Sequence, residues 1–354
     1  MPTTLTGVLQ HLIPPLLLTY FYFAWKICTF EIAPQLVSDN RIHPFFSFNH
    51  EDHSDVEPMI ERCYKGKCGG RWKPARSRHC SICERCRGGW DHHCPFFANC
   101  LSAPYMRSFL ALLLYTVPTV FIISSPLYVP IFQRLKAAYL YSKSDQYIRE
   151  NWWDWTYSWV VAGGPIGRYA GAAILGWRQL DRSDGGGIVR LNIGLMVGFG
   201  IILALISAGL AFTTITLLLE GNLTIDKGRS SAHQQALIAI EKLKQQNQPI
   251  PAGLIADLAR FSDKRHFFVP LPATLQKPGR KGIVIETLDH EKPYDHGWKK
   301  NLIIVLGLEW SWLLPWNALK RGMGDEVFIW PIKQGVERRL RKEAERKATL
   351  EIVD

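Results

Sequence analysis

The sequence predicts an α-helical, multi-pass membrane protein with a polar, cysteine-rich module between two of its membrane spans. Phe109 to Phe132 and Leu191 to Leu219 contain no charged residue. Each stretch exceeds the roughly 20 residues that an α-helix needs to cross a bilayer. The module is indicated by its cysteines, because seven of the eight in the chain lie between residues 63 and 100. The alternative for both stretches is a buried helix of a soluble core, but such helices rarely run so far without a charge.

The N-terminal segment, residues 1–33, contains a third apolar stretch. It is centred on residues 12–25, ends in several aromatic residues and is followed by Lys26. Tyrosine and tryptophan favour the membrane–water interface, and a lysine there can extend its amine into water. We therefore expect a third span, with a helix lying in the interface as the alternative. The segment lacks the small-residue cleavage site of a signal peptide.

The distribution of basic residues predicts the orientation of the chain. Lysine and arginine number 11 between residues 34 and 108, eight between 133 and 190, and 22 after residue 219. Since loops rich in these residues tend to stay in the cytosol, the first and last of these regions are predicted to be cytosolic. The predicted segments are thus an N-terminal span (1–33), a cytosolic module (34–108), a span (109–132), a lumenal loop (133–189), a span (190–219) and a cytosolic tail (220–354).

The cysteine spacing within the module predicts metal binding. A cytosolic segment is kept reduced, so crowded cysteines there favour a metal over disulfides. The pattern runs Cys63-x4-Cys68, then His79-Cys80-x2-Cys83-x2-Cys86, then His92-His93-Cys94-x5-Cys100. Neighbouring residues of an extended chain point to opposite sides, so His79 and Cys80 are expected to serve two different ions. Sulfur and imidazole ligands in this arrangement are typical of structural zinc.

Counting the ligands leaves one thiol over. Two sites of three cysteines and one histidine use six of the seven cysteines between residues 63 and 100. The count does not decide which cysteine remains, and it leaves open a site of four cysteines. A free thiol beside His92 and Asp91 is a candidate nucleophile, because the imidazole can take the thiol proton while the carboxylate fixes its tautomer.

Residues 73–100 resemble the core of the DHHC-type protein S-acyltransferases. The resemblance is carried by Lys-Pro-Ala-Arg-Ser-Arg-His-Cys-Ser-Ile-Cys-Glu-Arg-Cys and by Asp-His-His-Cys-Pro-Phe-Phe-Ala-Asn-Cys. It implies a ping-pong enzyme in which Cys94 takes a fatty acyl group from acyl-CoA and passes it to a cysteine of another protein. It implies that His92 is the base and Asp91 the group that orients it.

The same resemblance implies the ligand sets and the partners. One zinc ion would be held by Cys63, Cys68, His79 and Cys86, and the other by Cys80, Cys83, His93 and Cys100. The expected partners are acyl-CoA, the lipid bilayer and membrane-proximal proteins with cytosolic cysteines. The expected location is an endomembrane, the ER or the Golgi, with the active site facing the cytosol.

Some positions depart from the family pattern. Four residues rather than two separate Cys63 from Cys68, and Gly66 among them can absorb the extra turn. Phe96 stands where the family often has tryptophan and keeps an apolar side chain at the membrane face. Arg107 matches the family in place. Arg107 and Phe96 are the residues expected to contact the acyl-CoA.

Two segments after the last span resemble further motifs of the family. Leu223-Thr224-Ile225-Asp226 resembles a degenerate Thr-Thr-x-Glu motif, and residues 293–307 resemble a C-terminal motif that contains Asn301. We expect Asp226 and Asn301 to hold the tail against the cysteine-rich module. A loop of solvated polar residues is the alternative for each segment.

The family commonly has two spans before the module, whereas this sequence offers one. Two alternatives stay open: a three-span variant with a lumenal N-terminus, or a longer form with a fourth span. In the tail, residues 302–316 are apolar but short of a span, which favours an interfacial helix over the core of a soluble domain. Residues 333–347 alternate basic and acidic side chains, which is typical of a solvated helix.

The main competing function is a non-catalytic, membrane-tethered zinc module that binds partners. The net charge of +11 suits anionic lipid headgroups or the phosphates of CoA at least as well as nucleic acid. No recognition helix is apparent, and aromatic residues that could stack on bases are few in the module. We therefore expect no nucleic-acid partner.

Overall fold

The computed structural model describes most of the chain between residues 62 and 307, together with a C-terminal helix. The described residues are 12, 14–20, 22–23, 26, 46–48, 62–73, 76–185, 189–261, 264–276, 282–288, 291–307, 312, 314, 317 and 330–353. The chain divides into two compact units, one of Met1–Thr19 with Leu113–Leu210 and one of Tyr20–Leu112 with Ala211–Asp354.

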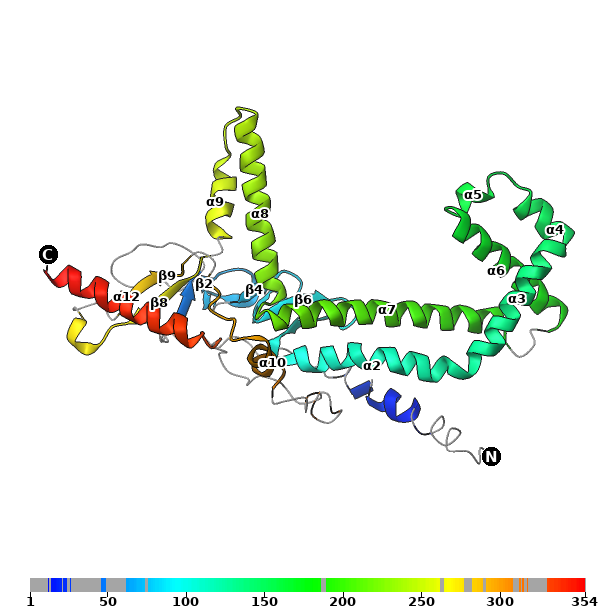
Figure 1. The fold of residues 1–354 in the computed structure, drawn as a ribbon, viewed down its shortest axis with the longest axis horizontal. Helices are drawn as coiled ribbons and strands as arrows, with labels where there is room; N and C mark the ends of the chain where they lie inside the picture. Colours follow the sequence, from blue (N-terminus) through cyan, green and yellow to red (C-terminus); the bar gives the residue numbers. More distant parts are fainter. Residues whose placement is uncertain are drawn as a thin grey trace. The chain divides into compact units, whose positions relative to one another are not determined.

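Two apolar helices dominate the middle of the chain (Figure 1). Helix α2 (Met106–Ser124) continues through a 3₁₀ turn (Ser125–Leu127) into α3 (Tyr128–Ser144), and α7 spans Leu191–Leu219. By length and composition, the helical stretches Ala103–Ser144 and Leu191–Leu219 are long and apolar enough to cross a membrane. The first of them stays helical well beyond Phe132, the predicted end of the span. Arg134 and later polar residues end the apolar pattern, but none of them is a residue that breaks a helix.

The predicted N-terminal span lies largely outside the described residues. Cys28, the one cysteine that precedes the module, also lies outside them. Residues 12, 14–20, 22–23 and 26 are helical. This span stays a prediction.

The segment between α3 and α7, expected as a loop, is mostly helical. It comprises α4 (Gln146–Ile148), a π-helical turn (Arg149–Trp153), α5 (Ser158–Val161) and α6 (Pro165–Ser183). Helices α3 and α6 lie side by side and form a hairpin (Figure 1). Gly176 permits the close approach, because a Cβ at this position would collide with the carbonyl oxygen of Ala138.

Three small β-hairpins build the cysteine-rich module. Strand β2 (Arg62–Cys63) pairs with β3 (Arg71–Trp72), β4 (Ser77–Cys80) with β5 (Arg85–Gly88), and β6 (Trp90–Cys94) with β7 (Asn99–Ser102). Gly66 has a φ of 51°, the left-handed conformation that glycine adopts without strain, and it forms the turn in the long Cys63–Cys68 interval.

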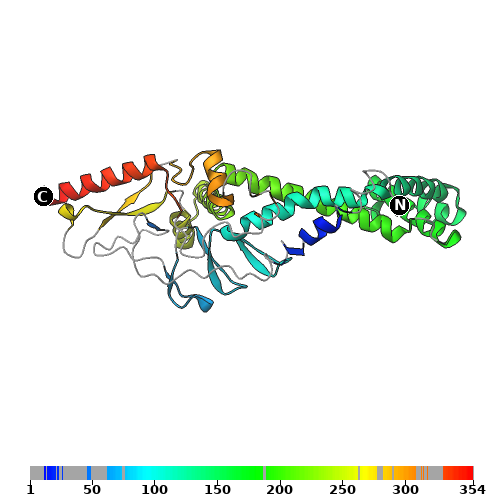
Figure 2. The same cartoon turned by 90° about the horizontal axis from the view of Figure 1, so that it is seen from below.

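The tail folds into more than the amphipathic segment expected from the sequence. Helices α8 (Thr224–Gln245) and α9 (Ala252–Arg260) pack against each other. Strands β1 (Phe46–Phe48), β8 (His266–Pro270) and β9 (Gly282–Glu286) form an antiparallel sheet in the order β1-β8-β9. Helix α12 (Gln334–Val353) lies along β8 and β9 (Figures 1 and 2).

The apolar segment 302–316 is only partly described. Its first residues belong to α10 (Trp298–Leu306), which ends at Gly307 with a φ of 85°. Val305 and Leu306 are buried, so this part of the segment packs inside the second unit. Residues 308–311, 313, 315 and 316 lie outside the described residues.

Candidate functional site

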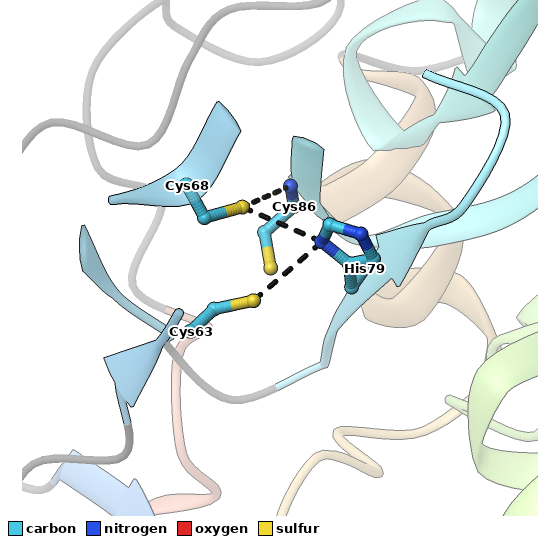
Figure 3. Close-up of side chains that lie close together, drawn as sticks. All are labelled: Cys63, Cys68, His79 and Cys86. Atoms are coloured by element: carbon cyan, nitrogen blue, oxygen red, sulfur yellow. Dashed lines mark hydrogen bonds between the residues drawn. The ribbon is translucent and has the colours of Figure 1, made fainter. Parts of the chain in front are cut away.

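The first group of metal-ligand side chains joins the two β-hairpins that precede residue 90. Cys63 ends β2, Cys68 follows in a 3₁₀ turn, and His79 and Cys86 face each other across β4 and β5. Their side chains converge (Figure 3). The Nδ1 atom of His79 lies 3.5 Å from Cys63 Sγ and 3.4 Å from Cys68 Sγ. The backbone N–H of Cys86 donates to Cys68 Sγ over 3.2 Å.

A second group of the same composition links the β4–β5 hairpin to the β6–β7 hairpin. His93 Nδ1 lies 3.7 Å from Cys80 Sγ, 3.4 Å from Cys83 Sγ and 3.7 Å from Cys100 Sγ. In each group the four ligand atoms all lie within 4.8 Å of one another. Tetrahedral zinc with its usual bond lengths separates neighbouring ligand atoms by about 3.3–3.8 Å, so both groups have the size of a zinc site.

Electrostatics also favour a cation in these groups. Burial raises the pKa of the Cys86 thiol far above its ordinary value, and burial with thiol neighbours raises the pKa of Cys100 to about 12. Burial acts in the same direction on Cys80, but hydrogen bonds, led by that from the N–H of Cys83, outweigh it and lower its pKa. Buried thiols of this kind become thiolates when a metal ion supplies the compensating charge. The donor set therefore fits zinc.

The two ligand sets inferred from the family resemblance are the two sets that lie together in the structure. Cys94 belongs to neither group. Among the described cysteines it is the one outside both groups, and its side chain is buried.

The β6 strand places Asp91, His92 and Cys94 close together. His92 and Cys94 are two residues apart in a strand, so their side chains share one face of the hairpin. A register shift between Trp90 and His92 interrupts the alternation beside Asp91. His92 Nδ1 donates a hydrogen bond to Asp91 Oδ2 over 2.8 Å. In the neutral imidazole this assigns the proton to Nδ1 and leaves Nε2 as the basic atom.

Asp91 has a second partner that the sequence reasoning did not single out. The hydroxyl of Thr224, in the first turn of α8, donates to Asp91 Oδ1. The only signal for Thr224 was its membership of the four-residue stretch that contains Asp226. The carboxylate that orients His92 is therefore itself held from the tail.

Asp226 anchors the same end of α8. Its carboxylate accepts from the backbone N–H of Leu223 over 3.0 Å, which satisfies an otherwise free donor at the helix start. It also pairs with Arg76 and Arg265, each at 2.9 Å. Asp226 thus bonds directly to Arg76 of the cysteine-rich module.

Arg76 joins the cysteine-rich module to the tail, a role that the sequence did not indicate. Besides its pair with Asp226, its guanidinium donates to the carbonyl of Gly221 over 2.6 Å. It lies over the rings of Tyr294 and Trp330, at 4.1 Å and 4.6 Å from their centres. Burial lowers its pKa, and the Asp226 carboxylate counteracts that effect. Its only sequence signal was its place in the quoted Lys-Pro-Ala-Arg stretch.

Asn301 organises a different part of the tail. Its side-chain amide donates to the carbonyl of Leu219 over 3.0 Å and to Asp295 over 2.9 Å, and its oxygen accepts from the N–H of His296. Burial tends to raise the pKa of Asp295, but the bonds from Asn301 and Gly297 outweigh it, so this pKa lies below its ordinary value. Asn301 therefore fastens the loop before α10 to the end of α7.

The two residues expected to contact acyl-CoA differ in their exposure to solvent. Phe96 is 83% exposed, on the turn that follows Cys94. Arg107 is partly buried, and its guanidinium donates to the carbonyl of Asn317 over 3.3 Å. His92 packs edge-on against Phe109 with ring centres 5.9 Å apart, which brings the site to the first turn of apolar helix α2.

Together these features define a class of protein: one with a buried thiol beside a histidine–carboxylate pair, framed by two Cys₃His groups and flanked by apolar helices. Comparison with known families narrows this class. Residues 59–233 match the model described as DHHC palmitoyltransferase, so this part of the chain is a DHHC palmitoyltransferase domain.

Individual relatives match over shorter stretches. The chain is 40% identical to palmitoyltransferase AKR1 of Mortierella alpina over 22% of its own length and 12% of that protein. It is 44% identical to probable protein S-acyltransferase 13 of Arabidopsis thaliana over 20% and 22% of the two chains. With palmitoyltransferase PFA3 of Saccharomyces cerevisiae it shares 29% identity over 32% and 36%. The matches thus span about a third or less of these relatives.

Proposed function

We propose that this chain is a membrane-bound protein S-acyltransferase that moves a fatty acyl group from acyl-CoA to cysteines of other proteins through a thioester on Cys94. The observation that carries the proposal is the position of Cys94. It is outside both ligand groups and in the same strand as His92, whose Nδ1 is tied to Asp91. The names of the relatives, palmitoyltransferase and S-acyltransferase, support the same reaction.

The reaction has two steps. In the first, His92 Nε2 accepts the Cys94 proton and the thiolate attacks the carbonyl carbon of the acyl-CoA thioester, while the CoA sulfur leaves and takes up the proton. In the second, the thiol of a substrate cysteine gives its proton to His92 and attacks the acyl-Cys94 thioester. Cys94 leaves as the thiol and the enzyme is restored.

The residues around this pair would act by positioning. Asp91 keeps the proton of neutral His92 on Nδ1 and stabilises the imidazolium that forms during transfer. Zinc, when bound by the two Cys₃His groups, would supply the folding energy of a module that has little apolar core of its own. Arg107 and Phe96 stay the candidates for contact with CoA and the acyl chain.

The proposed topology has α2 and α7 crossing the membrane, preceded by the N-terminal span. The cysteine-rich module and the tail would face the cytosol, and residues 133–189 the lumen of the ER or Golgi. Cys94 is close in sequence to the start of α2, so its substrates would be proteins whose cysteines lie near the membrane.

The decisive experiment measures acyl uptake and zinc content in the same preparations. Purified protein incubated with labelled palmitoyl-CoA should acquire a hydroxylamine-sensitive label, and Cys94→Ser should lose it while still holding about two zinc ions per chain. The control is Cys100→Ala, which should lose zinc and protease resistance. Loss of zinc in Cys94→Ser would make Cys94 a ligand. A folded, zinc-loaded wild type without label would favour the non-catalytic scaffold.

A further inference from the structure

The segment between α3 and α6 carries an apolar surface that the acyl transfer does not use. No charged residue occurs between Trp155 and Gly167. Six large apolar side chains of this stretch, here called the apolar tip, are exposed: Trp155 (40%), Tyr157 (66%), Trp159 (44%), Val160 (77%), Val161 (66%) and Ile166 (86%). Contiguous exposed apolar surface of this kind usually marks a surface that is covered in the working protein.

The hairpin holds the apolar tip in place. Trp152 and Trp153, just before it, point inward: their indole N–H groups donate to the carbonyl of Arg168 (2.9 Å) and the hydroxyl of Ser142 (3.3 Å). The Arg168 guanidinium bonds to the Trp153 carbonyl and lies over the Trp159 ring, 4.7 Å from its centre. Trp152 and Trp153 therefore pack within the hairpin. The aromatic residues that follow them, Trp155, Tyr157 and Trp159, are exposed on a fixed support.

The placement of the apolar tip within its unit indicates what covers it. Both ends of the hairpin continue into helices that are apolar and long enough to cross a membrane. Figure 1 shows α3 and α6 turning away from the direction of α2 and α7, and α5 lying on the side of the hairpin that faces back along those helices. With α2 and α7 crossing a membrane, as in the proposed function, a hairpin arranged in this way would lie across the end of the spans, with α5 on the side of the bilayer.

The composition of the apolar tip fits the same partner. Tryptophan and tyrosine combine an apolar ring with a polar group and favour the level of the lipid headgroups. Val160, Val161 and Ile166 add purely apolar side chains that gain by entering the boundary with the acyl chains. Ser158, between the exposed aromatic residues, is fully buried and turns the polar side of α5 inward.

We propose that residues 155–166 insert into the membrane interface on the side where α3 leaves and α7 enters the bilayer, as a second attachment beside the spans. The partner is a phospholipid surface. This inference rests on the membrane placement of α2 and α7 in the proposed function.

The test uses the full-length protein in nanodiscs, with one fluorescent amino acid incorporated at position 160. Nitroxide lipids labelled near the headgroup should quench this fluorophore at least about twofold more than aqueous iodide does. The matched control places the fluorophore at Glu150, an exposed charged position of the same segment outside the apolar tip, where iodide should dominate. Label uptake on Cys94 in each protein shows that it is folded.

Two results would overturn the proposal. Quenching by iodide at position 160 as strong as at position 150 would place the apolar tip in water. Protection from both quenchers would mean that protein, such as a second copy of the chain, covers it. A fluorophore at Leu205, in the middle of α7 and 63% exposed, reports on the spans independently. Its quenching by deep nitroxide lipids separates failure of the apolar tip from failure of the membrane placement.

Discussion

The Asp91 carboxylate has a different partner on each oxygen. Oδ2 accepts from His92, the proposed base, and Oδ1 accepts from Thr224 at the start of α8. A carboxylate held from two directions keeps its orientation even if one partner moves. Through this arrangement the tail contributes to the site without providing any atom that reacts.

Removing the Thr224 hydroxyl should slow acyl transfer without affecting zinc. A hydrogen bond to a charged group contributes about 1.5–3 kcal/mol, which corresponds to about a tenfold to hundredfold slower uptake of acyl groups by Thr224→Ala. Thr224→Ser keeps the hydroxyl and should stay within about threefold of the wild type. Equal loss in both variants would show that the methyl packing, and not the hydrogen bond, is what matters.

The Arg76–Asp226 pair is buried, with side-chain exposures of 4% and 11%. Asp226 keeps its second partner, Arg265, when Arg76 is removed, but it loses a buried bond between two charged groups. Arg76→Met should therefore lower the free energy of unfolding by about 1.5–3 kcal/mol. The matched control is Arg341→Met, since Arg341 pairs with Glu337 on a helix surface with 48% of its side chain exposed. An exposed pair of this kind contributes about 0.5 kcal/mol or less.

Denaturant unfolding in detergent measures both variants. A cost for Arg76→Met close to that of Arg341→Met would contradict the view that this pair joins module and tail.

At the level of elements, α12 differs most from its sequence-based expectation. The alternating charges of residues 333–347 indicated a solvated helix, and one face is indeed polar. The opposite face is buried against the sheet and consists of residues four apart: Val336, Leu340, Ala344 and Ala348. That spacing is one stripe of an α-helix, although two of its members are alanines and carry little hydrophobic signal.

This packing predicts a sharp contrast between two leucines of α12. Leu340 is fully buried, so Leu340→Ala should lower the free energy of unfolding of the tail by about 2–5 kcal/mol. Leu350 lies on the same helix with 54% of its side chain exposed, and Leu350→Ala should change stability by about 0.5 kcal/mol or less. Thermal unfolding followed by circular dichroism compares the two. Similar small effects would mean that α12 is not docked on β8 and β9.

At the level of the whole molecule, the proposed mechanism requires the active site to lie on one particular side of the membrane. Acyl-CoA is cytosolic in the proposed function, so Cys94 must face the cytosol. In sealed vesicles, an impermeant thiol reagent added on the cytosolic side should abolish acyl uptake, whereas the same reagent confined to the lumen should not. An epitope tag after Gly185, where a side chain would meet open space, should be digested by protease only from the lumen. The reverse pattern for Cys94 would remove its access to acyl-CoA.

Much of the site could be predicted because it depends on residues close in sequence. The two ligand groups lie within residues 63–100, and their spacing, chemistry and family resemblance were enough to name them. The apolar stretches of α2 and α7 could be predicted for the same reason, since an uncharged run of that length is a local property.

Contacts between distant residues could not be predicted in this way. Thr224 meets Asp91, Arg76 meets Gly221, Tyr294 and Trp330, and Phe46–Phe48 pairs with β8. No local period connects such residues, because their proximity is decided by how whole elements pack. A short stretch of sequence thus contains both the proposed nucleophile and the two groups that could hold metal ions. What holds Asp91, and through it His92, in position is decided by the folding of the tail onto that stretch.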